Sequence, residues 1–197
     1  MNMNNRNEII FVTSNSYKYK IAQKQINGSA FKLVQKRMNI SEIQDESVKK
    51  IAEFSACWAS SVLNKPVAVS DGGCYIEAFN GFPGPFIKYI NKWLSAKDLI
   101  AMMQNKKKRC LVWKSCLAYC EPNGKPVSFT STFKGRVSRE VGENIHRKEY
   151  GWIDSLFIPD GFIRPLSELS NKDYLNFWKD NNWERLLLFL EKNKNFK

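Results

Sequence analysis

Histidine is almost missing from this sequence, because His146 is the only one in 197 residues. A Ser-His-Asp arrangement would have to be built around that one side chain, and no G-x-S-x-G elbow presents a nucleophile. The five cysteines show no C-x-x-C spacing, and Cys116 and Cys120 have no histidine near them. Histidine-based catalysis and a zinc site are therefore both disfavoured. We expect the cysteines to be small buried hydrophobic residues in a reducing compartment.

Long apolar runs are missing as well. The first eight residues, MNMNNRNE, are polar, and no stretch approaches the ~18 apolar residues of a membrane span. The chain also has no internal repeat, low-complexity tract or obvious linker. These absences predict a soluble cytoplasmic protein without a membrane partner, folded as a single domain over residues 1–197.

The chain has enough apolar surface for a real core, since 43% of its residues are hydrophobic and 13% are aromatic. Its formal net charge of +12 points to an anionic partner. Charge alone favours nucleic acid first, with a free nucleotide or an acidic surface as alternatives. The one dense basic run, KKKR at 106–109, is expected to be a solvated loop.

Strand-like and helix-like segments alternate along the chain. Strands are predicted at 8–13, 31–36, 66–70 and 74–79, and Pro and Asn-Gly in EPNGK predict a hairpin between 109–120 and 125–134. Helices are predicted at 15–27, 47–64, 86–94, 96–104 and within 172–192. The apolar face of the second helix comprises Val48, Ile51, Ala52, Ser55, Ala59, Val62 and Leu63, and that of the last comprises Trp183, Leu186, Leu187 and Leu190. This alternation predicts an α/β fold with a mixed sheet.

The stretch FVTSNSYKYK runs from a strand through a polar turn into a helix. Free backbone N–H groups at the helix start, with Lys18 on the first turn, could hold phosphate. A strand-to-helix turn capped by Ser or Asn is more often purely structural, so both interpretations stay open.

Two carboxylates on separate segments, Glu42 and Asp71, could converge on magnesium, which prefers one or two carboxylates plus waters and phosphates. Asp71 follows an apolar strand, where open α/β sheets place their ligands. Lys88 follows PGPF at a helix start, where it could meet phosphate oxygens. Tyr150 and Trp152 could stack on a nucleobase. For the two carboxylates and the lysine, the alternative is a solvated surface charge. For the aromatic pair, the alternative is a place in the core.

Taken together, six segments occur in the order typical of the inosine/xanthosine triphosphate pyrophosphatase (ITPase) family. TSNSYK at 13–18 resembles its T-G-N-x-x-K phosphate motif, and EIQ at 42–44 resembles the segment with its metal glutamate. The most specific match is SDGGCYIEAFNGFPGPFIK at 70–88, which resembles an aspartate-centred segment followed by a G-x-P-G-P/T-[YF]-x-K turn. The other three are FKGRVS at 133–138, YGWIDSLFIPDG at 150–161 and SELS at 167–170, which resemble the family's F-x-G, F-G-[YW]-D-P-x-F-x-P-x-G and A-E-M segments.

The resemblance implies a magnesium-dependent enzyme that hydrolyses ITP, dITP and XTP to monophosphate and pyrophosphate. It implies a homodimer, and an elongated α/β domain of two lobes with a central mixed sheet, flanking helices and a substrate cleft between the lobes. A nucleotide substrate, rather than nucleic acid, then becomes the expected anion. By resemblance, Asp71 holds or activates the attacking water and the metal. The other implied roles are Mg²⁺ binding by Glu42 with Asp71, phosphate binding by Thr13, Asn15, Lys18 and Lys88, and base binding by Tyr150, Trp152 and Asp154.

The chain also departs from the family pattern. The family's Ser-His-Arg before the last helix is replaced by LNFWKDNNWER, and the pair His146–Arg147 is a candidate substitute. Ser70 stands where an acidic residue is usual, Ser55 where a lysine is expected, and the inserted Ile153 leaves open whether Asp154 reaches the base. The alternatives are therefore a weakly active or inactive nucleotide-binding member, or a pyrophosphatase with altered base specificity.

Overall fold

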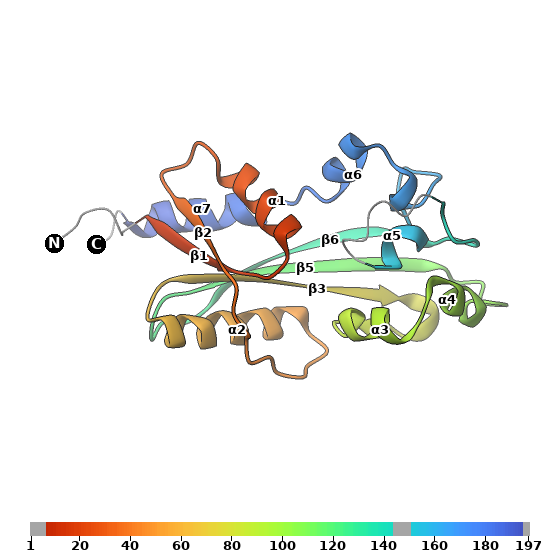
Figure 1. Ribbon diagram of the computed structural model, residues 1–197, viewed down its shortest axis with the longest axis horizontal. Helices are drawn as coiled ribbons and strands as arrows, with labels where there is room; N and C mark the ends of the chain where they lie inside the picture. Colours follow the sequence, from red (N-terminus) through yellow and green to blue (C-terminus); the bar gives the residue numbers. More distant parts are fainter. Residues whose placement is uncertain (1–6, 144–150, 195–197) are drawn as a thin grey trace. The chain divides into compact units, whose positions relative to one another are not determined.

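The computed structural model of this chain describes residues 7–143 and 151–194. Its seven strands form one sheet in the order β2-β1-β3-β5-β6-β7, with β4 paired to β3 off this path. β1 pairs in parallel with β2 and β3, whereas the β3–β4 and β6–β7 pairs are antiparallel. The predicted α/β class, with a mixed sheet flanked by helices, is confirmed (Figure 1).

Strands and helices alternate in the first two fifths of the chain, as the sequence pattern predicts. The elements are β1 (Glu8–Val12), α1 (Ser16–Ile26), β2 (Lys32–Lys36), α2 (Val48–Leu63), β3 (Val67–Ile76), the 3₁₀ helix η2 (Glu77–Phe79), β4 (Pro83–Gly84), α3 (Ile87–Trp93), α4 (Ala96–Met102), β5 (Cys110–Cys120), β6 (Val127–Val137), α5 (Ile153–Leu156), β7 (Phe157–Pro159), the 3₁₀ helix η3 (Leu166–Glu168), α6 (Asn171–Phe177) and α7 (Asn182–Lys194). The predicted hairpin is present, because β5 and β6 are neighbours in the sheet joined by the short EPNGKP connection.

The chain divides into two compact units. The first unit comprises residues up to Asp71, Ser115–Ser131 and residues from Asp180 onward, and the second comprises Gly72–Lys114 and Thr132–Lys179. Strands β3, β5 and β6 each contribute residues to both units.

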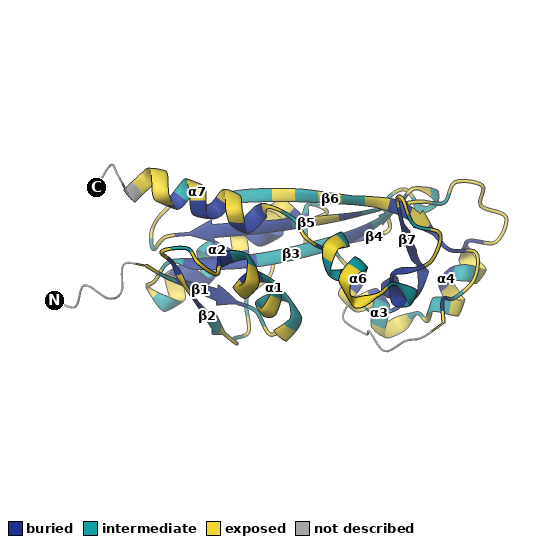
Figure 2. Cartoon of the chain, turned by 90° about the horizontal axis from the view of Figure 1, so that it is seen from above, coloured by how far each residue is buried: buried dark blue, intermediate teal, exposed yellow. Residues whose placement is uncertain are grey.

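The first unit contains two β-α-β crossovers, β1-α1-β2 and β2-α2-β3, and β1 lies between β2 and β3 and pairs in parallel with both. Helices α1 and α7 cover one face of its sheet and α2 covers the other (Figure 1). β1 is almost fully buried, and α7 is buried along one side (Figure 2). The predicted stripe on α7 packs into the core, where the rings of Trp183 and Phe11 meet edge to face at 5.0 Å.

Helix α2 buries most of its predicted apolar face. Val48, Ile51, Ala52, Ser55 and Ala59 are all buried. The prediction is wrong for Val62, whose side chain is 56% exposed. Val62 lies in the last turn before Asn64, which ends the helix in a left-handed conformation.

The prediction of two separate strands around Asp71 is also wrong. β3 runs unbroken from Val67 to Ile76, so Asp71 lies inside a strand and not at its end. Gly72 and Gly73 look like a turn signal in the sequence, but they lie in extended backbone. They are needed for close approach, because a Cβ on Gly73 would lie 3.0 Å from the backbone of Gly84 in β4, and one on Gly72 would lie 2.8 Å from the Trp113 ring.

The second unit is built around aromatic side chains. Trp178 contacts the rings of Trp113, Phe133, Phe157, Tyr174 and Phe177, with ring centroids 4.9 to 6.4 Å apart. Most of these pairs are edge to face, the geometry that aromatic quadrupoles favour.

The single helix predicted within 172–192 is two helices in the structure, α6 and α7. Ser170 caps α6 by accepting a hydrogen bond from Asp173 N. Between the two helices, Asp180 accepts a hydrogen bond from the backbone N of Asn182, the first residue of α7, at 3.1 Å. The apolar pattern continues through this break, so periodicity alone did not reveal it. No helix in the described part of the chain is long and apolar enough to cross a membrane.

Strands β6 and β7 approach each other closely at Gly135. It pairs with Pro159, and a Cβ at this position would overlap the carbonyl oxygen of Ile158 and lie 2.9 Å from Pro159 Cα. Because backbone atoms cannot give way, we expect Gly135→Ala to lower the free energy of unfolding by about 1–3 kcal/mol. Urea denaturation measures this. Thr132→Ala, at an exposed position of the same strand, should change it by no more than about 0.5 kcal/mol. Equal effects of the two substitutions would contradict this packing.

Candidate functional site

The turn between β1 and α1 and the first turn of α1 hold three of the predicted phosphate ligands, Thr13, Asn15 and Lys18. The Asn15 side chain accepts hydrogen bonds from the N–H groups of Tyr17, at 2.9 Å, and Lys18, at 3.1 Å, and so caps α1. The Asn15 N–H in turn donates to Thr13 Oγ1 at 3.2 Å. The capping role that the sequence left open is therefore present, and phosphate binding by Thr13 and Asn15 stays a prediction.

Lys18 connects this turn to the strand that carries Asp71. Its ammonium group donates to the Ser70 carbonyl at 3.1 Å. This contact arises because β1 and β3 run in parallel and Val12 lies opposite Val69, so the turn after β1 comes beside Ser70 and Asp71. The first unit thus brings Thr13, Asn15 and Lys18 together with the Ser70–Asp71 segment.

Asp71 is half-buried. The pKa of the Cys116 thiol on β5 is raised to about 12, first by burial, then by the Glu53 carboxylate and then by the Asp71 carboxylate. Asp71 therefore acts electrostatically on Cys116. Glu53, on α2, is a second carboxylate of this region that the sequence did not single out. It accepts a hydrogen bond from Ser128 at 2.6 Å and lies 3.8 Å from Lys49. Glu53 and Asp71 lie on different elements, and only the folded structure shows that both act on Cys116.

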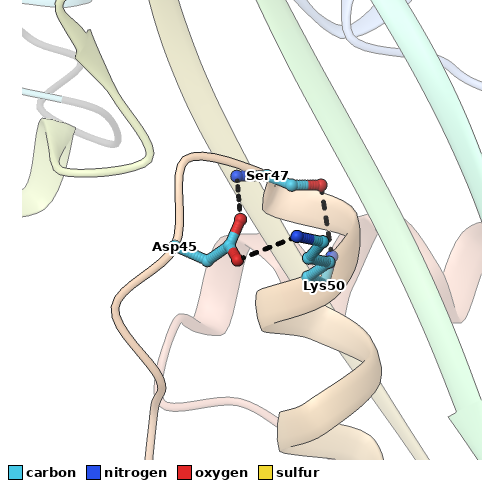
Figure 3. A network of polar contacts seen from close by, with 3 residues as sticks. All are labelled: Asp45, Ser47 and Lys50. Carbon is cyan, nitrogen blue, oxygen red and sulfur yellow. Dashed lines mark hydrogen bonds and ion pairs between the residues drawn. The ribbon is translucent and has the colours of Figure 1, made fainter.

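Glu42 is exposed, in the segment 37–46 that has neither helix nor strand. The far end of this segment is fixed by Asp45, which accepts hydrogen bonds from Ser47 N at 2.8 Å and from Lys50 Nζ at 3.2 Å (Figure 3). The bond from Ser47 N and then the Lys50 ammonium lower the pKa of Asp45. Ser47 also caps α2. Metal binding by Glu42 stays a prediction.

No group of three or more His, Cys, Asp and Glu side chains gathers as a ready-made metal site within residues 7–143 and 151–194.

In the second unit, the Gly-Phe-Pro-Gly-Pro turn folds back onto β3. Pro83 and Gly84 form β4 and pair with Tyr75 and Cys74. Gly84 has a φ of 59°, a conformation that favours glycine. Lys88 then follows as an exposed residue in the first turn of α3.

Asp154 is buried, with 1% of its surface exposed. The hydroxyl of Tyr174 donates to its two carboxylate oxygens at 3.3 and 3.2 Å. Tyr174 lies on α6, at the edge of the segment that replaces the expected Ser-His-Arg, and the sequence analysis missed it. It follows Asn171, Lys172 and Asp173, and nothing in this local sequence marks it as a partner of Asp154.

Trp152 is buried at 8% exposure, and its ring nitrogen has no hydrogen-bond partner among the residues that the structure describes. The alternative of a core aromatic therefore describes its position, and base stacking by Trp152 stays a prediction. The preceding Gly151 has a φ of 70°, and a Cβ there would lie 2.7 Å from the Asn91 side chain of α3. This close approach brings the segment of Trp152 and Asp154 against the helix that carries Lys88. Tyr150, His146 and Arg147 lie outside the described residues.

The basic run at 106–109 is only partly a solvated loop. Lys106, Lys107 and Lys108 are exposed, and Lys108 pairs with Glu77 at 2.8 Å. Arg109 instead donates to the carbonyls of Met103, Val137 and Ser138. It lines a pocket of about 460 Å³ in the second unit whose other lining residues are Arg136, Val137, Ser138, Arg139, Glu140 and Ile158. Burial and the charge of Arg139 lower the pKa of Arg109.

Comparison with known proteins gives consistent matches. The family model described as the Ham1 family matches residues 9–176. A protein of Methanopyrus kandleri named dITP/XTP pyrophosphatase is 32% identical over 163 residues, covering 82% of this chain and 84% of the relative. A protein of the same name from Thermococcus kodakarensis is 30% identical over 166 residues, covering 84% and 86%.

Solved structures show the same fold. A HAM1 protein from Coxiella burnetii superimposes with a TM-score of 0.77 at 19% identity, covering 94% of this chain and 98% of the other. The Staphylococcus aureus Ham1 protein gives the same TM-score of 0.77 at 20% identity, covering 94% and 99%.

The Tyr174–Asp154 contact can be tested directly. Tyr174→Phe removes a donor from a buried carboxyl group, so we expect a loss of about 1–3 kcal/mol in the free energy of unfolding, measured by urea denaturation. Tyr89→Phe is the matched control, because Tyr89 is 44% exposed and its hydroxyl can bond to water. It should change the free energy by no more than about 0.5 kcal/mol. A neutral Tyr174→Phe would show that the hydroxyl does not support Asp154.

Proposed function

Because the chain belongs to the Ham1 family, we propose that it hydrolyses the non-standard purine nucleotides ITP, dITP and XTP to the monophosphate and pyrophosphate. The relatives named dITP/XTP pyrophosphatase support this, since they match over most of both chains. The structural observation that carries the proposal is the contact of Lys18 with Ser70, which joins the turn after β1 to the strand of Asp71. A cation, a helix N-terminus and a carboxylate then lie in one region, as hydrolysis of a metal-bound triphosphate requires.

Magnesium would be held by Asp71 and Glu42. Asp71 suits this role because it is a half-buried carboxylate next to the segment that Lys18 contacts. When bound, such an ion neutralises charge on the phosphates during the reaction. The small number of carboxylates agrees with the way magnesium is usually bound.

The residues of this chain would supply positioning and charge. In the first unit, Asp71 orients the attacking water and accepts a hydrogen bond from it, while Lys18 offsets negative charge on the triphosphate. Thr13 and Asn15 supply a hydroxyl and an amide to phosphate oxygens. In the second unit, Lys88 is exposed at the start of α3 and contributes a further cation to the triphosphate.

Base recognition involves Asp154, Trp152 and Tyr150 in this proposal. Asp154 is already held by Tyr174, so its carboxyl group has a fixed orientation. A fixed hydrogen-bonding group discriminates between bases more strongly than a flexible one, because a mismatched base leaves it unpaired.

The second candidate is a weakly active or inactive member, or a pyrophosphatase with a different base preference. The specific observation in its favour is Ser55, which is 2% exposed on α2 where the family pattern leads one to expect a lysine. A buried hydroxyl cannot supply that charge to a phosphate. The replacement of Ser-His-Arg by the segment of Tyr174 favours altered base preference in the same way.

We also propose that the protein is a cytoplasmic homodimer. The second unit exposes several large apolar side chains on α3, on the turn before it and on α4. They are Phe82, Phe86, Tyr89, Trp93 and Met102, and Trp93 is 71% exposed. The rings of Tyr89 and Trp93 lie side by side on α3 with centroids 6.0 Å apart, and an exposed apolar patch is typical of a surface that binds another protein.

The proposed reaction predicts pyrophosphate release that depends on magnesium. Purified protein should be assayed with ITP, XTP and the four standard nucleoside triphosphates, with pyrophosphate and orthophosphate measured separately. We expect pyrophosphate as the product, at the highest kcat/KM with ITP or XTP. Stabilisation by magnesium-nucleotide without product would favour the inactive member, and orthophosphate release would contradict the assigned reaction.

Asp71→Asn keeps the shape of the side chain and removes its charge. We expect turnover to fall by ~10²-fold or more while the melting temperature stays close to that of the wild type, because a preorganised charge at a reacting phosphate has about this effect. Asp98→Asn, at an exposed position of α4, is the control and should keep full turnover. If Asp71→Asn turns over within a few-fold of the wild type, Asp71 does not have this role.

A further inference from the structure

Two cysteines far apart in the sequence meet inside the first unit. Cys57 lies on α2 and Cys120 is the last residue of β5, 63 positions later, and their sulfur atoms are 2.7 Å apart. Both are free thiols. The covalent S–S bond is about 2.05 Å long, so the two sulfurs need to move together by well under ~1 Å to be joined.

The two thiols differ in access. Cys57 is half-buried and therefore within reach of a small solute, whereas Cys120 is 1% exposed. Cys120 Sγ also lies 3.4 Å from the carbonyl oxygens of Glu121 and Gly124 in the turn after β5. Burial, and then the hydrogen bond with Cys57, raise the pKa of Cys120 to about 12. Cys57 is thus the thiol that meets an oxidant, and Cys120 is the one held against it.

We propose that Cys57 and Cys120 form a site of reversible oxidation at which a hydroperoxide converts the two thiols into an internal disulfide. In the first step the Cys57 sulfur attacks the peroxide oxygen, the O–O bond breaks, and Cys57 becomes a sulfenic acid with release of water or an alcohol. In the second step the Cys120 sulfur attacks the Cys57 sulfur, the S–O bond breaks, and the Cys120 proton leaves with the hydroxyl group as a second water. The peroxide takes up two electrons in all, and a dithiol reductant restores both thiols.

The disulfide would tie α2 to the end of β5 within the first unit. Because it closes a long stretch of chain, it restricts the unfolded state far more than the folded one. The remaining cysteines do not offer this geometry. Cys74 and Cys116 are buried, so neither offers an accessible thiol, and Cys110 is exposed on the second unit.

The test uses the full chain carrying Cys110→Ser, so that the exposed thiol cannot link two molecules. The protein is treated with hydrogen peroxide and its intact mass is measured. The remaining free thiols are then blocked, and the protein is digested without reductant for mass spectrometry. We expect a peptide pair joined through Cys57 and Cys120, an intact mass lower by two hydrogen atoms, and a melting temperature higher by about 5–10 °C. Dithiothreitol should reverse all three changes.

Adding Cys57→Ser should abolish the joined peptides and the thermal shift, and this half-buried position tolerates serine better than the buried Cys120 does. Adding Cys116→Ser instead should leave both effects in place. Oxidation of Cys57 to a sulfinic or sulfonic acid without joined peptides would overturn the proposal, as would the same thermal shift in the Cys57→Ser protein. The readout is covalent and needs no nucleotide, so it is independent of whether the protein proves to be a pyrophosphatase.

Discussion

The path of β3 is the constraint on which both groups of candidate residues depend. The strand begins beside β1 in the first unit and continues past Asp71 to pair with β4 in the second. Its pairing with β1 places the turn of Lys18 beside Ser70, and its pairing with β4 holds the turn that precedes Lys88. Gly72 and Gly73 allow this, because side chains there would collide with Trp113 and Gly84. The pair of glycines next to Asp71 thus has a packing role that is separate from any catalysis.

The high positive charge of the chain has more than one use in the structure. Lys18 contacts a backbone carbonyl next to Asp71, Lys108 pairs with an exposed glutamate, and Arg109 holds three carbonyls together at the end of the second unit. Charge alone had favoured nucleic acid as the partner. Membership of the Ham1 family instead indicates a nucleotide substrate.

The family pattern is interrupted where base recognition is expected, and the structure shows what replaces it. The segment without Ser-His-Arg, residues 175–185, runs from the end of α6 to the start of α7, and Tyr174, directly before it on α6, donates hydrogen bonds to the buried Asp154. Two other departures from the family pattern, Ser55 and Ser70, lie in the first unit, which also contains the predicted phosphate and metal residues. The family pattern is therefore altered in both units.

The sequence by itself determined the α/β class, nearly all helices and strands of the first unit, the hairpin and the family, because these depend on local periodicity, turn residues and ordered motifs. The tertiary structure alone decided that β3 continues through Gly72 and Gly73, that α6 and α7 are separate, and that Val62 is exposed. It also decided which distant side chains meet: Lys18 with Ser70, Tyr174 with Asp154, and Cys57 with Cys120. Such contacts join residues dozens of positions apart, and a local pattern carries no information about them because they arise only when strands pair and helices pack.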